Sequence, residues 1–128
     1  TSAREPVFLP DMVEPGMHIN AVGASIPSWQ EIDSGVVPVV TLFTDRRESL
    51  ANEAGEFIAA VDDGLVPAGL VVPEIGEVLN DDHPGRTSET EITLFRSLGL
   101  AIEDIAAAHL VYCRAVERGG GTRVDLSG

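Results

Sequence analysis

The chain has 128 residues, 44% of them hydrophobic, and this length predicts one compact domain at most. Twenty-one acidic residues outweigh eight arginines, there is no lysine, and the formal net charge is −13 at pH 7. Because such a chain repels phosphate groups, the charge disfavours binding to nucleic acid or to an anionic membrane surface. The missing lysine excludes Schiff-base chemistry by this chain.

The ends of the chain and its cysteine content bear on where the protein works. No apolar run approaches the ~20 residues that a bilayer-spanning helix needs. The first residues, Thr1–Pro6, lack the basic and apolar regions of a signal peptide, and without an initial methionine we expect the native chain to begin upstream. The single cysteine, Cys113, excludes an internal disulfide framework and a cysteine-rich zinc site. These features predict a cytoplasmic protein.

Two segments in the first third of the chain predict buried strands. Residues Met17–Val22 are mostly apolar and follow a turn signal, as expected of the first strand. Residues Val36–Thr44 are rich in β-branched side chains and predict the second. Because Pro38 cannot donate a hydrogen bond to a ladder, this strand either begins late or lies near a sheet edge.

Helical spacing of apolar residues follows in the middle of the chain. Residues Asp45–Ala60 predict a helix that ends near 62–64. The apolar stretch Ala68–Val72 leads into a short helix over Pro73–Leu79, and Asn80–Gly85 is predicted to be a polar loop.

The last third predicts a long kinked helix over about residues 88–118. Ser88 and Glu91 have the spacing of a capping box, which predicts a helical start that continues through Phe95. Gly99 marks a kink or break, after which one apolar face continues for five turns.

The end of the chain completes the predicted architecture. Gly119–Gly121 would cap the long helix at its carboxyl end, and Thr122–Leu126 could form a final short strand. Strands that alternate with helices favour an α/β arrangement.

The chemistry-bearing residues by themselves indicate little. His18, His83 and His109 share no metal-ligand spacing, so we expect no metal site. The chain contains no nucleophile-elbow, P-loop or dinucleotide glycine motif. The residues alone therefore predict no more than an acidic α/β domain.

A series of short motifs runs through nearly the whole chain. They are, in order, Pro15–Gly16 with His18–Ala24, Pro27, Glu31, Asp45–Arg46, Glu53–Gly55, Glu74–Val78, Pro84–Arg86 and Glu91–Asp104. In this order and spacing they resemble the ornithine cyclodeaminase/mu-crystallin family.

The resemblance implies an α/β, Rossmann-type NAD(P)-binding fold of which only the C-terminal portion is present. Residues 1–128 would be the later part of the nucleotide-binding domain, with residues 88–118 as its closing helix. The N-terminal half, which in the family binds substrate and forms the dimer, would be absent, and so would the glycine-rich pyrophosphate turn. The resemblance thus implies NAD or NADP as cofactor, a homodimeric parent enzyme, and an isolated chain that is inactive.

Positions matching the family's site can be carried over one by one. Ile19, Asn20, Ala21 and Val22 resemble the strand end beside the nicotinamide, and Ser97 resembles a cofactor-facing position. Leu98 and Glu53 resemble substrate-side positions. From the residues alone, Asn20 could be a simple turn residue and Glu53 a solvated carboxylate. The break after Ser97 could likewise be a packing kink.

Ser25 is where this sequence departs from one branch of the family. Ornithine cyclodeaminases have there an aspartate that acts on the substrate, and a serine hydroxyl cannot act as a carboxylate base. The stretch Ser25–Glu31, with Trp29, resembles the mu-crystallin-like branch. We therefore assign Ser25 to the catalytic, substrate-binding site.

The sequence thus favours reduction of a ketimine, or dehydrogenation of an amino acid, with a small amino or imino acid as substrate. Three alternatives stay open. They are ornithine cyclodeamination, a ligand-binding protein without relevant turnover, and an interaction module that works alone.

Overall fold

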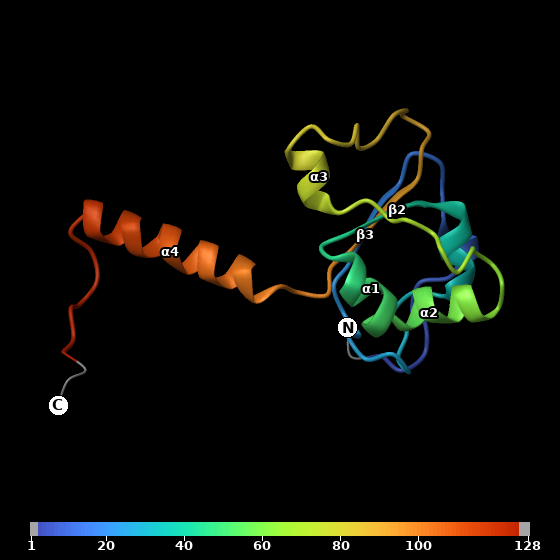
Figure 1. Ribbon diagram of the computed structural model, residues 1–128, viewed down its shortest axis with the longest axis horizontal. Helices are drawn as coiled ribbons and strands as arrows, with labels where there is room; N and C mark the ends of the chain where they lie inside the picture. The colour runs from blue at the N-terminus through green and yellow to red at the C-terminus, as the bar shows by residue number, and fades with distance from the viewer. Residues whose placement is uncertain (1–2, 126–128) are drawn as a thin grey trace.

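The computed structural model describes residues 3–125 and has a small parallel sheet at its centre. Three strands, β1 (His18–Ala21), β2 (Thr41–Thr44) and β3 (Thr93–Arg96), lie in the order β1-β3-β2 (Figure 1). The last strand in the sequence is therefore the central one. It pairs in parallel with β1 on one side and with β2 on the other.

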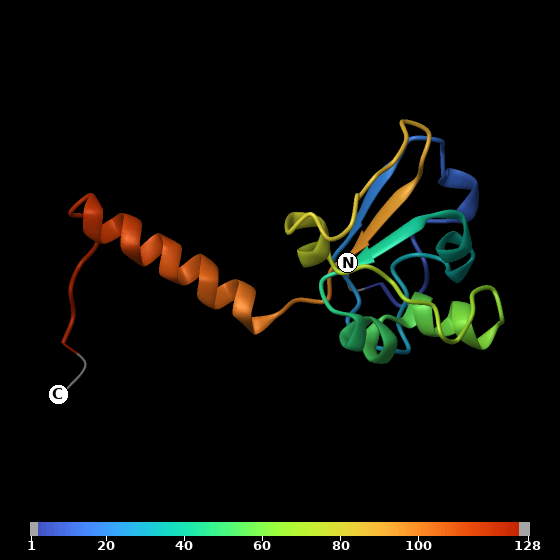
Figure 2. The same cartoon turned by 45° about the horizontal axis from the view of Figure 1, so that its top comes forward.

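Helices cover both faces of this sheet. The 3-10 helix η2 (Ser34–Val39), α1 (Arg47–Glu53) and α2 (Gly55–Asp62) lie on one side, and α3 (Ile75–Leu79) lies on the other (Figure 2). The main core forms on the α1–α2 side, around the buried side chains of Val36, Leu42, Leu50, Phe57 and Leu94. A second 3-10 helix, η1, spans Pro10–Met12.

The first predicted strand, α3 and the second strand follow the sequence pattern closely. Residues 18–21 form β1, and residues 75–79 form α3, as expected. The second strand begins late, at Thr41, and lies at a sheet edge, because the residues around Pro38 form η2 instead. The predicted long helix from Asp45 is interrupted at Ala54, whose ψ of 99° is not helical, and this break separates α1 from α2.

The prediction of one kinked helix over residues 88–118 is wrong in its first half. Residues Thr93–Arg96 form the central strand, and only Ala101–Glu117 are helical, as α4. Half of the expected capping box does form, since the Glu91 N–H donates to Ser88 Oγ at 3.1 Å. This hydrogen bond closes a local turn and does not start a helix. The residues after it form a strand, because pairing on both sides of β3 satisfies more backbone groups than a short helix would.

The Glu91 carboxylate instead joins β2 to the loop before β3. It accepts hydrogen bonds from the Thr41 hydroxyl at 2.6 Å and from the Thr87 main chain and hydroxyl. These bonds, that of Thr41 first, lower the pKa of Glu91 to about 2.

We expect Glu91→Gln to be less stable than the wild type at pH 6, with a difference that shrinks as the pH falls toward 2. The unfolded carboxyl, with an ordinary pKa of about 4.5, binds a proton in that range while the folded one does not, so the contribution of Glu91 is lost on acidification. Urea denaturation at pH 6 and pH 3 measures this. Glu89→Gln, an exposed neighbour, is the control, and an unchanged pH dependence in Glu91→Gln would contradict the prediction.

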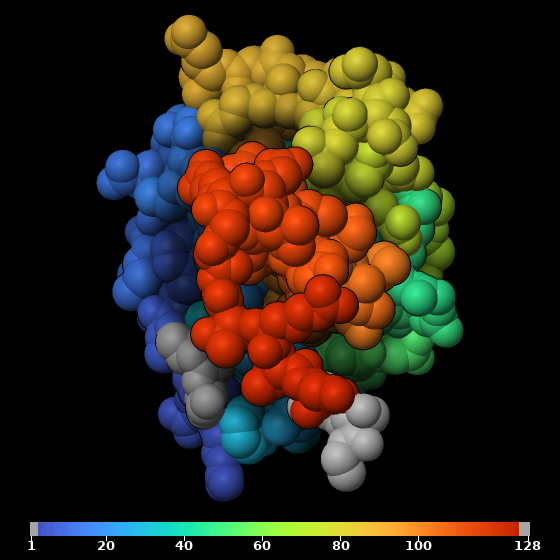
Figure 3. All heavy atoms as spheres, turned by 90° about the vertical axis from the view of Figure 1, so that its left-hand side faces the viewer, coloured from blue at the N-terminus to red at the C-terminus, as the bar shows by residue number. Residues whose placement is uncertain are grey.

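Helix α4 projects away from the rest of the molecule (Figures 1 and 2). In Figure 3, which looks from that side, it stands in front of the other elements. Its apolar face is open, with Ile102 65% and Val116 62% exposed. The predicted glycine cap is confirmed by Gly119, which follows the helix at a φ of +64°.

Beyond the cap, the predicted strand over 122–126 is wrong for residues 122–125, which have no strand partner, and Leu126 lies outside the described residues. No helix within residues 3–125 is long and apolar enough to cross a membrane.

Candidate functional site

Two predicted site segments meet where β1 and β3 end. The Ser97 N–H, just after β3, donates to the Ala21 carbonyl of β1 at 2.9 Å. This contact places the segment Ser97–Gly99 beside the loop Val22–Ala24. Ligands of open parallel sheets bind at the carboxyl ends of the strands, where these segments lie.

Asp45, the first residue after β2, holds one of these segments. Asp45 is 5% exposed, and its Oδ2 accepts hydrogen bonds from the N–H groups of Leu98 at 2.6 Å and Gly99 at 2.7 Å. The other oxygen, Oδ1, accepts from the Arg46 N–H at 2.8 Å. The carboxylate thus fixes the backbone between β3 and α4.

Arg96, the last residue of β3, holds the other segment. Its fully buried guanidinium donates to the carbonyls of Ala24 and Ser97, both at 2.8 Å, and forms an ion pair with Glu56 of α2. From outside the loop, Glu31 accepts from the Gly23 N–H at 2.7 Å. The loop after β1 is therefore held through the Ala24 carbonyl and the Gly23 N–H.

Burial raises the pKa of Glu56, and the neighbouring Arg96 partly opposes that rise. One carboxylate oxygen, Glu56 Oε2, is buried without a hydrogen-bond partner among the described residues. The ion pair is therefore the main compensation for a carboxylate in the core.

The predicted cofactor residues of β1 differ in exposure. Ala21 is buried, Ile19 is half-buried, and Asn20 and Val22 are exposed, Val22 by 66%. Ile19, Asn20 and Ala21 line a hollow of about 240 Å³ along the outer edge of β1. Ser97 joins them through its N–H, as described above.

The predicted substrate residues lie on three different segments. Leu98 is half-buried in the break before α4, where Gly99 has a φ of +88°. Ser25 is exposed on the loop after β1, and Glu53 is half-buried at the end of α1. The loop that follows Ser25 packs against the α1–α2 junction, because a Cβ on Gly55 would lie 2.1 Å from the Trp29 carbonyl oxygen. The roles of these residues stay predictions.

Sequence reasoning missed the three charged residues that hold the site together, Asp45, Arg96 and Glu56. Asp45 stood in a motif without an assigned role. Arg96 was placed on a helix, whereas in the strand register it shares a face with the core residue Leu94. An arginine among apolar residues of a strand is the signal that could have revealed a buried partner.

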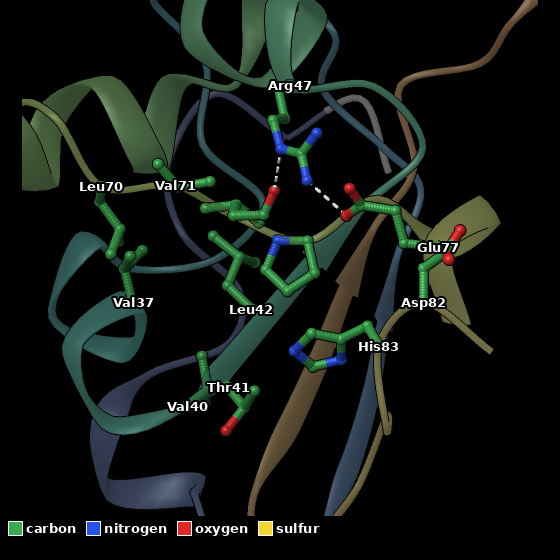
Figure 4. A pocket seen from close by; sticks show the side chains of 12 residues that line it. Val37, Val40, Thr41, Leu42, Arg47, Leu70, Val71, Glu77, Asp82 and His83 are labelled. Atoms are coloured by element: carbon green, nitrogen blue, oxygen red, sulfur yellow. Dashed lines mark hydrogen bonds and ion pairs between the residues drawn. The ribbon is translucent and has the colours of Figure 1, made fainter. Parts of the chain in front are cut away.

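A larger pocket, of about 490 Å³, lies elsewhere, along the outer edge of β2 (Figure 4). Its apolar wall includes Val37, Leu42 and Leu70. Its guanidinium, that of Arg47, donates from Nε to the Val72 carbonyl at 2.7 Å and pairs with Glu77, whose pKa the pairing lowers. None of the predicted site residues lines this pocket, and its cation already has an internal counter-ion.

The three histidines contact different parts of the chain. His18 lies 2.7 Å from the Thr93 hydroxyl, His83 accepts from the Gly85 N–H, and His109 neighbours Cys113 on α4. Within residues 3–125, no group of three potential metal ligands comes together.

Comparison with known proteins gives consistent matches over almost the whole chain. The model of the ornithine cyclodeaminase/mu-crystallin family matches residues 1–119. The ketimine reductase mu-crystallin of Mus musculus is 41% identical over 112 residues, which are 88% of this chain and 33% of that protein.

Solved structures match equally well. Thermococcus litoralis Δ(1)-pyrroline-2-carboxylate reductase, in complex with NADH and L-proline, matches with a TM-score of 0.88 and 40% identity, over 97% of this chain and 38% of that one. An archaeal alanine dehydrogenase dimer with bound NAD matches with a TM-score of 0.82 and 38% identity, over 98% and 39%.

The chain thus spans between 33% and 39% of the length of these relatives. The similarity confirms the predicted family and the α/β, Rossmann-type segment, and it shows that reductases and dehydrogenases with bound NADH or NAD share this part of the fold. The chain belongs to the ornithine cyclodeaminase/mu-crystallin family.

Proposed function

We propose that this chain is the C-terminal part of an NAD(P)-dependent oxidoreductase that reduces a ketimine or dehydrogenates an amino acid. The observation that carries the proposal is the meeting of Ser97–Gly99 with the loop after β1 at the carboxyl ends of the strands. The N-terminal half of the protein would complete the substrate site, and the chain alone would not turn over substrate.

The residues present fit the nicotinamide end of a dinucleotide. Exposed Asn20 and Val22 stand at the end of β1, next to the fixed backbone of Ser97. The nearby carboxylates of Glu31 and Asp45 accept hydrogen bonds from backbone N–H groups. When bound, the nicotinamide supplies or accepts the hydride, and the protein contributes orientation and exclusion of water.

Only this end fits, because the chain lacks a glycine-rich turn between a strand and a helix to hold the pyrophosphate. Pyrophosphate binding belongs to the upstream half in our proposal, and so does the choice between NAD and NADP. The exposed apolar face of α4 supports a further element of the proposal, a larger assembly such as a homodimer, because contiguous apolar surface normally packs against protein.

Ser25 supports reduction over cyclodeamination. Its hydroxyl is exposed and neutral, so it can orient a substrate by a hydrogen bond but cannot hold an ammonium group by charge. A small amino or imino acid, with its own carboxylate, meets less repulsion at a serine than at an aspartate.

The test uses the longer gene product that carries the upstream half, and it follows the oxidation of NADH and NADPH with cyclic ketimines and the conversion of ornithine. We expect ketimine reduction, with little ornithine conversion. Ser25→Ala should lower the rate about threefold to tenfold, since one neutral hydrogen bond is lost, and Ser25→Asp should lower it further.

Ser28→Ala, an exposed serine of the same loop, should leave the rate unchanged. Efficient ornithine cyclisation by the wild type would overturn the proposal, and so would tight NAD(P)H binding without turnover of any imino or amino acid.

A further inference from the structure

We propose, resting on the function proposed above, that Asp45 is a positioning residue for hydride transfer. Its carboxylate fixes the backbone of Ser97–Gly99 against the end of β1 and so sets where the nicotinamide ring lies. Asp45 reaches the cofactor through this backbone.

The first observation is how the carboxylate is used. Asp45 is almost fully buried, and its described partners are N–H and O–H donors: the main chain of Arg46, Leu98 and Gly99, with the hydroxyls of Thr44 and Ser97 at longer distance. No ion pair to Asp45 occurs within residues 3–125. A buried carboxylate needs such donors, and the geometry places two of the shortest on one segment of the proposed site.

The second observation is which backbone groups of Ser97–Gly99 have no hydrogen-bond partner among the described residues once Asp45 and Arg96 are bound. The N–H groups of Leu98 and Gly99 are taken by Asp45, and the Ser97 carbonyl is taken by Arg96. In the part of the chain that the structure describes, no backbone N–H donates to the Leu98 carbonyl. The Leu98 carbonyl is therefore available to a carboxamide, and the Ser97 hydroxyl, which donates to Asp45 at 3.4 Å, can still accept a hydrogen bond.

The third observation is that one carboxylate connects three strand ends. Asp45 follows β2, the segment that it holds follows β3, and the Ser97 N–H connects that segment to Ala21 at the end of β1. A shift of Ser97–Gly99 would therefore move both sides of the proposed nicotinamide site.

An asparagine cannot replace this carboxylate. Its side chain offers one acceptor oxygen, and its NH₂ group would face either the N–H groups of Leu98 and Gly99 or that of Arg46. In the first orientation two donors point at each other and the segment Ser97–Gly99 must move away. In the second orientation the clash is with the Arg46 N–H, which displaces the side chain that holds the segment.

The experiment measures two ligands in the longer gene product. NADH contains the nicotinamide, whereas ADP-ribose lacks it and would bind through the upstream pyrophosphate site alone. We expect Asp45→Asn to weaken NADH binding about tenfold, the loss of one hydrogen bond between the displaced backbone and the nicotinamide carboxamide, and to change ADP-ribose binding less than twofold. The primary isotope effect with NADH deuterated at the transferred position should rise, because hydride transfer becomes slower than the other steps.

Two further variants make the result decisive. Asp62→Asn, an exposed aspartate at the end of α2, is the matched control and should behave as the wild type. Asp45→Glu keeps the charge but moves it by one methylene group, so it should fold and show the same selective loss of NADH binding. It decides the question if Asp45→Asn does not fold.

Three results would count against us in different ways. Wild-type NADH affinity and isotope effect in both Asp45 variants would overturn the positioning role and leave the proposed function intact. Equal weakening of NADH and ADP-ribose in Asp45→Glu would also overturn it, since it would show a general structural role. Failure of the wild type to bind any nicotinamide dinucleotide would overturn the proposed function itself.

Discussion

Arg96→Met is expected to lower the free energy of unfolding by about 3–5 kcal/mol, the range measured when one partner of a buried ion pair is removed. Both side chains are almost completely buried, Arg96 at 1% and Glu56 at 2% exposure. The substitution leaves the Glu56 carboxylate in the core without a cation, and it leaves the carbonyls of Ala24 and Ser97 without their donor. Urea denaturation followed through the single tryptophan, Trp29, measures the loss.

This loss should grow with rising pH. Without Arg96, burial raises the pKa of Glu56 further above its unfolded value. The folded state then binds a proton that the unfolded state releases, so stability is retained below pH 4.5 and declines as the pH rises through the raised pKa. Glu56→Gln in the Arg96→Met background should therefore recover stability at pH 8, because it removes the uncompensated charge.

Arg46→Met is the matched control, since Arg46 pairs with Glu48 at the surface, where such pairs contribute about 0–1 kcal/mol. A similar loss in Arg46→Met and Arg96→Met would show that burial of the Arg96 pair has no special weight.

Gly55→Ala is the second substitution with a large expected effect, a destabilisation on the order of 3 kcal/mol, at the upper end of overpacking costs. An added Cβ would lie 2.1 Å from the Trp29 carbonyl oxygen and 2.7 Å from that of Pro27. Both are backbone atoms, so the loop that carries Pro27–Trp29 must move as a whole. Equilibrium unfolding and the emission maximum of Trp29 should both change.

Gly76→Ala separates this effect from a general preference for glycine. Gly76 is also in a helix, α3, but nothing lies within 4 Å of its Cβ position. Alanine should there be neutral or stabilising by up to about 1 kcal/mol, as its higher helix propensity predicts. A mild effect of Gly55→Ala, with unchanged Trp29 emission, would show that the loop adapts.

Elements that depend on local patterns could be predicted from the sequence. The strand at His18–Ala21, helix α3, and the long amphipathic α4 with its cap at Gly119 all appear where their residues indicate. Each follows from periodicity, turn residues or a cap within a few positions. The motifs likewise identified the family and the backbone segments of the candidate site.

The role of Thr93–Arg96 could not be read locally. Its neighbours include the Ser88–Glu91 spacing, which is typical of a helix start, and that hydrogen bond is indeed present. The segment is a strand because β1 and β2 pair with it on either side, and those partners come from distant parts of the chain. A central strand is stabilised by hydrogen bonds that no short window of sequence contains.

The charged framework of the site was likewise decided only by the tertiary structure. By itself the sequence determined an acidic α/β chain of a recognisable family, with its site segments in order. It could not show that Asp45 binds the N–H of Leu98, 53 residues away, or that Arg96 pairs with Glu56, 40 residues away. A carboxylate or guanidinium is tolerated in a core only where donors or acceptors from remote segments converge on it, and that convergence is a property of the folded chain.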